Sequence, residues 1–185
     1  MPNYRRVDVE GGTYFFTVVT YRRQRFLCDD DVRAALRDGV NKARQQLPFV
    51  IDAWVLPPDH LHCIWRLPDG DADFGKRWAM IKRFVAKRCE PRLKRDEWMT
   101  KSKIRRNEST IWQRRFWEHL IRNENDLNGH RNYIHHNPVK HGCVNHIRDW
   151  PYSTFHRYVK EGVYPIDWCG GMDVNGYEAF DICST

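Results

Sequence analysis

The sequence predicts an α+β protein of the ferredoxin-like (RRM-like) class, in which an antiparallel sheet carries helices on one face. Short runs of β-branched and aromatic residues alternate with two segments whose apolar residues recur at helical spacing. Their order along the chain is strand, helix, strand, strand, helix, strand, which is the pattern of that fold. With 185 residues, of which 41% are hydrophobic, the chain suits one compact domain.

The first three strands are expected in the N-terminal third of the chain. Residues 13–21 read TYFFTVVTY, which is typical of a strand buried on both faces. Residues 49–56 and 60–67 predict two more strands, which Pro57-Pro58-Asp59 would join as a hairpin. Aspartates at 29–31 suit the start of an intervening helix. Its apolar stripe consists of Val32, Ala35, Leu36, Val40, Ala43 and Leu47.

The second helix is expected to begin near Phe74 and to end at Pro91. A basic segment that runs to about Asn107 has little apolar content and predicts a mobile loop. Residues 110–121 predict a fourth strand, interrupted near Arg114-Arg115.

An additional helix should follow the fourth strand, capped near Asn125 or Asp126 and finished by Asn137, because Pro138 comes next. A turn at 151–154 predicts one more short helix. We expect residues 1–160 to form the domain and residues 161–185 to form a tail that packs on it.

The charge distribution favours a polyanionic partner. The net charge is +7, yet residues 76–115 alone hold 15 Lys or Arg against four Asp or Glu, a local excess of eleven. Such a segment is typical of a nucleic-acid contact, although a solvated charged face is the alternative. The candidate DNA-binding residues are Arg83, Lys87, Arg88, Arg114 and Arg115.

Several classes of protein are disfavoured by the sequence. The six cysteines include no C-x-x-C pair, which argues against a zinc ribbon. The first ten residues are polar, and no apolar run approaches the roughly 20 residues needed to span a bilayer. We therefore expect a cytoplasmic protein with reduced thiols that associates with the nucleoid through DNA, and no membrane partner.

Two constellations carry possible chemistry. His60 and His62 leave the same face of a strand and could hold a metal ion, or they could simply face solvent. Tyr133 and Asn137 share a face of a helix, where a phenol is a plausible nucleophile and an amide oxygen suits Mg²⁺ or Mn²⁺. A core tyrosine and a helix-capping asparagine are the alternative. Glu118 could support a metal ligand or form a surface ion pair.

These motifs resemble those of one transposase family. Residues 58–65 (PDHLHCIW) resemble the HUH motif of insertion-sequence and REP-associated tyrosine transposases, and residues 133–142 (YIHHNPVKHG) resemble the tyrosine helix of the family and the turn after it. Residues 116–119 (FWEH), residues 149–156 (DWPYSTFH) and the opening Tyr4-Arg5-Arg6 are similar to segments of the REP-associated branch. The resemblance spans roughly residues 4–168.

The resemblance implies a set of roles. It makes Tyr133 the nucleophile and His60, His62 and Asn137 the ligands of Mg²⁺ or Mn²⁺, although relatives from insertion sequences often carry Gln at the last position. The implied products are a 5′-phosphotyrosine and a free 3′-OH. The base that deprotonates the phenol is left open between water, His130, His135 and His136.

The leading hypothesis is therefore an endonuclease and strand transferase that cuts and rejoins REP-like hairpin DNA with a single-stranded flank. The alternative is a catalytically inactive RRM-like or domesticated DNA-binding module. Resemblance to the REP-associated branch implies a monomer, whereas relatives on insertion sequences exchange their tyrosine helices as dimers. A monomer is therefore favoured, and a dimer stays open.

Overall fold

The computed structural model describes residues 8–170, so the opening Tyr4-Arg5-Arg6, Cys183 and the part of the tail from residue 171 lie outside the described residues. Four antiparallel strands form one sheet in the order β2-β3-β1-β4. They are β1 (Thr13–Val19), β2 (Val50–Val55), β3 (His60–Arg66) and β4 (Trp117–Leu120). Insertion of β3 between β1 and β2 produces the ferredoxin-like arrangement and confirms the predicted fold class.

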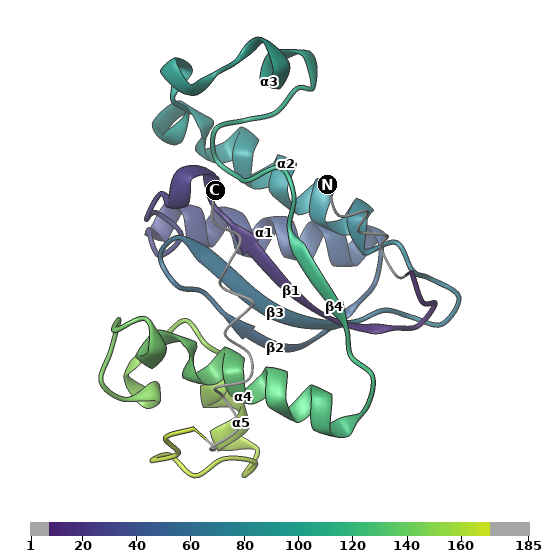
Figure 1. Ribbon diagram of the computed structural model, residues 1–185, viewed down its shortest axis with the longest axis vertical. Helices are drawn as coiled ribbons and strands as arrows, with labels where there is room; N and C mark the ends of the chain where they lie inside the picture. Colours follow the sequence, from purple (N-terminus) through teal and green to yellow (C-terminus); the bar gives the residue numbers. More distant parts are fainter. Residues whose placement is uncertain (1–7, 171–185) are drawn as a thin grey trace, which may run out of the picture.

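Helices cover both faces of this sheet (Figure 1). On one face lie α1 (Asp30–Gln46) and α2 (Phe74–Leu93), which pack against each other. On the other face lie α4 (Glu124–Lys140) and the short α5 (Phe155–Lys160). None of the described helices is both long and apolar enough to cross a membrane.

The alternation of side chains along β1 explains the two layers. Tyr14, Phe16 and Val18 point into the main core under α1 and α2, where Trp65 and Trp78 stack with ring centroids 4.2 Å apart. Phe15 points the other way, into a smaller core beneath α4. Because both faces are covered, every residue of β1 after Thr13 is buried, as its run of β-branched and aromatic residues predicts.

Three predicted helix boundaries were wrong. α2 continues past Pro91 to Leu93, and α4 continues past Pro138 to Lys140. Each proline stands in the last turn, where its missing N–H removes one hydrogen bond without disrupting a following turn. At the other end, α4 is capped by Asn123, whose side-chain oxygen accepts from the main-chain N–H of Asp126 at 2.9 Å.

The prediction of a mobile loop before Asn107 was also wrong. This segment contains a 3₁₀ turn, η2 (Asp96–Trp98), and the short helix α3 (Lys101–Arg105). Trp98 packs on the 3₁₀ turn η1 (Tyr21–Arg23), and the Lys103 ammonium lies 3.8 Å from the centre of the Tyr21 ring. Two residues therefore anchor a segment whose overall composition is polar.

Candidate active site

His60 and His62 lie in β3, which is paired with β1 so that His60 is opposite Val19 and His62 is opposite Thr17. Since alternate residues of a strand share a face, both imidazoles point toward α4. Their ring centroids are 4.8 Å apart, and both residues are buried. The expectation that they leave one face together is confirmed, whereas solvent exposure is excluded.

Each imidazole is oriented by a hydrogen bond at Nδ1. His60 Nδ1 lies 2.7 Å from an Asp59 carboxylate oxygen, and His62 Nδ1 lies 2.9 Å from the Thr17 hydroxyl. Burial raises the pKa of Asp59, but hydrogen bonds from His60 and the Arg23 guanidinium outweigh it, so the net pKa is lowered and the carboxylate stays ionised. Both rings therefore present Nε2 as the atom for a ligand.

Tyr133 and Asn137 are brought to the same place by α4. Both are buried, and the Tyr133 ring centroid lies 5.2 Å from that of His62. The Asn137 amide nitrogen donates to the Tyr133 hydroxyl at 3.5 Å. Packing of α4 across β3 thus joins two motifs that are separated by about 70 residues in the sequence.

The buried polar atoms of this cluster fit a divalent cation. Among the described residues, neither His60 Nε2 nor Asn137 Oδ1 has a hydrogen-bond partner. A buried polar atom without a partner is costly, by about 1–3 kcal/mol. An imidazole nitrogen and an amide oxygen are both metal-ligand atoms, and the three candidate ligands are neutral, so they would leave the charge of a cation undiminished.

The surroundings of the three candidate bases differ. Burial is the main cause that lowers the pKa of His130 to about 4 and that of His135 to about 3, and it also lowers the pKa of His136. His135 Nε2 lies 3.0 Å from the Thr154 hydroxyl, and its ring packs against α5. This side chain is therefore engaged with α5 instead of the tyrosine hydroxyl.

Two residues beside the cluster were missed by the sequence analysis. The ring of His141, an exposed residue, lies 5.0 Å from that of His60, and the Lys140 ammonium lies 5.0 Å from the centre of the Tyr133 ring. Helical spacing could have found them, because Lys140 lies seven residues after Tyr133 and His141 lies four after Asn137. The assumed helix end at Asn137 concealed this signal.

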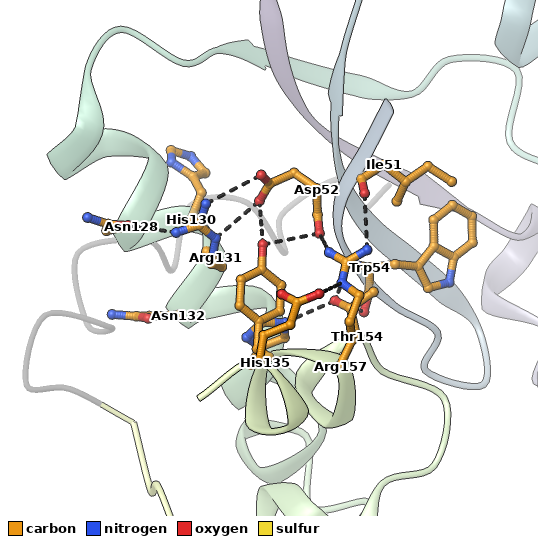
Figure 2. A network of polar contacts seen from close by, with 12 residues as sticks. Ile51, Asp52, Trp54, Asn128, His130, Arg131, Asn132, His135, Thr154 and Arg157 are labelled. Atoms are coloured by element: carbon orange, nitrogen blue, oxygen red, sulfur yellow. Dashed lines mark hydrogen bonds and ion pairs between the residues drawn. The ribbon is translucent and has the colours of Figure 1, made fainter. Parts of the chain in front are cut away.

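A polar network fastens α4 to the edge of the sheet (Figure 2). The Arg131 guanidinium donates to the Asp52 carboxylate at 3.1 and 3.4 Å, and the Tyr158 hydroxyl donates to the same group at 2.9 Å. Asp52 lies at an irregularity of β2, between Ile51 and Ala53, where the pairing register shifts. The network therefore joins β2, α4 and α5 around one carboxylate.

The described part of the tail extends this contact. The Tyr164 hydroxyl donates to the Asn132 side-chain oxygen of α4 at 2.7 Å, and its ring packs 4.4 Å from that of Trp168. Residues 161–170 thus lie against α4 and α5.

The candidate DNA-binding residues do not share one surface. Arg83, Lys87 and Arg114 line a cavity of about 530 Å³ between α2 and residues 106–114. Arg88 instead forms an ion pair with Asp38 of α1, and Arg115 is exposed outside that cavity.

Other residues of the basic segment are engaged within the protein. Arg77 is fully buried and paired with Asp71 at 2.7 Å, and Arg92 is paired with Asp29 and Asp31 at 2.8 Å. The formal excess of charge therefore overstates the positive charge of this segment that is available to a ligand.

Glu118 cannot support the histidine pair directly. It is opposite Phe16 in the register of β1 and β4, so it points toward α2, on the other side of the sheet. The adjacent His119 is opposite Phe15 and shares the face of His60 and His62. Within residues 8–170 the five cysteines are free thiols, and Cys63 is buried in the main core, as expected.

Comparison with known proteins gives close relatives along almost the whole chain. The REP-associated tyrosine transposase of Escherichia coli (strain K12) is 46% identical over 179 residues, which cover 97% of this chain and 96% of that protein. A relative from Haemophilus influenzae (strain KW20 / Rd) is 42% identical over 178 residues, covering 94% of this chain and 97% of the relative.

A solved structure shows the same similarity in three dimensions. The structure of a REP-associated tyrosine transposase bound to a REP hairpin matches with a TM-score of 0.78 and 46% identity, covering 92% of this chain and 93% of that chain. No family model matches the sequence.

Proposed function

Since the chain belongs to the family of REP-associated tyrosine transposases, we propose that it cuts and rejoins single-stranded DNA at REP-like hairpins, with Tyr133 as the nucleophile. The observation that carries this proposal is a cluster of buried side chains that contact one another between β3 and α4: His60, His62, Tyr133 and Asn137. The solved relative is bound to a REP hairpin, which supports a hairpin as the DNA partner of this chain.

The proposed reaction is a transesterification. The Tyr133 oxygen attacks the phosphorus of a phosphodiester, and the bond from phosphorus to the 3′ oxygen breaks. The phenol proton passes to a base or to water, and the leaving 3′ oxygen takes up a proton from water or from that base. The DNA then carries a 5′-phosphotyrosine and a free 3′-OH. Attack by a 3′-OH on the phosphotyrosine reverses these steps, so strand transfer needs no ATP.

The side chains of His60, His62 and Asn137 would hold Mg²⁺ or Mn²⁺. Such a cation supplies positive charge that offsets the charge of the phosphate as the tyrosine oxygen approaches. The protein supplies orientation: Asp59 and Thr17 fix the two imidazoles, and Asn137 contacts the tyrosine hydroxyl one turn away. Preorganisation of this kind limits the reorganisation needed during attack.

The DNA should approach from the end of α4 that carries His141. Tyr133 and His62 are buried, whereas His141 is exposed and adjoins His60. The cavity lined by Arg83, Lys87 and Arg114 adjoins the same end of the sheet, because Gln113 donates its N–H to the carbonyl of Val19, the residue opposite His60. A hairpin with an unpaired 5′ flank could contact both regions. We place the protein on DNA in the cytoplasm, acting as a monomer.

The decisive experiment uses Tyr133→Phe, which keeps the ring and its packing but removes the attacking oxygen. The variant should fold and bind a labelled hairpin, yet form neither a covalent adduct nor a cut product on a denaturing gel. Tyr152→Phe, which removes a hydroxyl outside the cluster, is the matched control and should cut normally.

Mass spectrometry of the tryptic adduct should place the DNA on Tyr133. Normal cleavage by Tyr133→Phe, or an adduct on another residue, would refute the assignment. Hairpin binding by the unchanged protein without any adduct, at every Mg²⁺ and Mn²⁺ concentration, would instead support the DNA-binding module.

A further inference from the structure

Three side chains of metal-ligand type converge outside the His60–His62 cluster, where β4 meets the start of α4. They are His119, Asp126 and His130, and one ligand atom from each lies within 4.8 Å of the others. His119 belongs to β4, whereas Asp126 and His130 lie one turn apart in α4. Their meeting therefore depends on how the helix packs against the strand.

The distances bring several donor atoms to one point. His119 Nε2 lies 3.1 and 2.9 Å from the two carboxylate oxygens of Asp126. His130 Nδ1 lies 2.9 Å from Asp126 Oδ1 and 2.9 Å from the main-chain oxygen of Asp126. Two imidazole nitrogens and the main-chain carbonyl of Asp126 thus lie close to one carboxylate.

The cluster is shielded, unlike an exposed acidic patch. The side chain of His130 is 1% exposed and that of Asp126 is 16% exposed. The His119 ring stacks on the His130 ring with centroids 4.6 Å apart. The Arg122 main-chain N–H donates to Asp126 Oδ2 at 2.9 Å, which leaves Oδ1 oriented toward His130.

The hydrogen bonds of the cluster show what a cation would have to displace. A main-chain carbonyl only accepts, so the His130 Nδ1 that faces the Asp126 carbonyl donates in the absence of a metal ion. Metal ligands must be deprotonated, so a cation would take the place of the protons that the two imidazoles share with Asp126.

We propose that His119, Asp126 and His130 form a second cation site, which takes Zn²⁺ or a similar transition metal. Two imidazoles with one carboxylate, and one position left open, is a donor set found in protein zinc sites. Imidazole nitrogen favours Zn²⁺ over Mg²⁺, whereas Mg²⁺ prefers oxygen ligands. The site shares no residue with the His60–His62 cluster. The Phe15 ring contacts both, with its centroid 4.8 Å from that of His130 and 5.4 Å from that of His62.

Occupation of this site would fix the junction of β4 and α4, and its ligand His130 lies three residues before Tyr133 on α4. The inference does not depend on the proposed reaction, since it concerns binding alone. The alternative is that the three residues form only a hydrogen-bonded brace.

Zinc titration in excess Mg²⁺, followed by calorimetry, separates these possibilities. The unchanged protein and the double variant His60→Ala/His62→Ala should each bind one Zn²⁺ at this site. Asp126→Asn should lose this binding, whereas His146→Ala, which removes an exposed histidine outside both clusters, should retain it. His119→Gln keeps a side chain able to donate to Asp126 but lacks the imidazole, so it provides the same test if Asp126→Asn does not fold.

Absorption spectra of the Co²⁺-loaded double variant identify the ligands. We expect d–d bands without thiolate charge transfer, and their loss in the variant that also lacks the His119 imidazole. Loss of Zn²⁺ in the double variant, retention of Zn²⁺ by a folded Asp126→Asn or His119→Gln protein, or a thiolate charge-transfer band would each overturn the proposal.

Discussion

The Thr17 hydroxyl is hydrogen-bonded to His62 Nδ1 at 2.9 Å, and this contact orients the imidazole so that Nε2 faces the candidate metal site. Thr17→Val keeps the shape of the side chain and removes this partner. Loss of such an outer contact typically weakens metal affinity about 10–100-fold. We therefore expect cleavage by Thr17→Val to require correspondingly more Mg²⁺ or Mn²⁺ for half of its maximal rate.

Thr13→Val is the control, since it makes the same change on the same strand at the far end from the histidines. Metal titrations of the cleavage rate provide the measurement. An unchanged metal requirement in Thr17→Val would show that the hydroxyl does not orient His62 in the working enzyme.

His135 links stability to pH. Burial lowers its pKa from 6.5 to about 3, assisted by the Arg131 and Arg157 guanidinium groups. Because the folded-state pKa lies below the unfolded value, this histidine destabilises the fold as the pH falls below 6.5, and its contribution is fully favourable only above that pH. The expected slope is roughly 1.4 kcal/mol per pH unit between these limits.

Urea unfolding at a series of pH values tests this slope, with His135→Gln as the comparison. The variant has no titrating group at this position, so its stability should fall less steeply between pH 6.5 and pH 4. Parallel curves for the two proteins would contradict the role given to His135.

At the scale of elements, α4 is held in place by Asp52. Asp52→Asn removes the carboxylate that accepts from Arg131 and Tyr158 (Figure 2). Hydrogen bonds to charged groups contribute about 1.5–3 kcal/mol, so we expect a loss of about 2 kcal/mol in the free energy of unfolding. The cleavage rate should fall as well, because the position of Tyr133 depends on α4, while hairpin affinity should change little.

Asp38→Asn is the matched control, since Asp38 forms an exposed ion pair with Arg88. Pairs of that kind contribute about 0–1 kcal/mol. Equal effects of the two substitutions on unfolding and cleavage would show that the network does not position the helix.

The two sides of α2 should differ in their contribution to DNA binding. Arg83 and Lys87 line the cavity beside residues 106–114, whereas Arg88 is engaged with Asp38. Arg83→Ala and Lys87→Ala should each weaken hairpin binding and reduce the slope of log affinity against log salt by about 1. Arg88→Ala should change the slope less, and equal slopes for all three variants would contradict the cavity as a DNA contact.

At the scale of the whole molecule, the sequence predicted what depends on simple periodicity. The sheet follows from the order of strands and helices along the chain, which is that of the ferredoxin-like fold. The shared face of His60 and His62 follows from the alternation of residues along a strand. The pairing of Tyr133 with Asn137 follows from the helical period. Proximity of these two pairs came from family resemblance, because no local pattern reports which face of a sheet a later helix will cover.

The parts that the sequence did not predict depend on tertiary contacts. Pro91 and Pro138 look like helix ends, yet a proline in the last turn of a helix removes only one hydrogen bond, so the helix can continue past it. Arg77 looks like a surface charge in the sequence. In the fold its guanidinium donates to Asp71 and to three main-chain carbonyl groups, and the residue is buried. His141 becomes visible as a neighbour of His60 only once α4 is known to continue through Pro138.

The junction between β4 and α4 is very short, since only residues 121–123 separate Leu120 from Glu124 (Figure 1). Three residues reach roughly 10 Å when fully extended, and the N–H of Ile121 is already bonded to the carbonyl of Thr13. So short a connection favours a Tyr133 that acts within its own domain, in line with the monomer that we propose. We then expect the two ends of a DNA segment to be cut one after the other, at a rate per molecule that does not change with protein concentration in a dilution series.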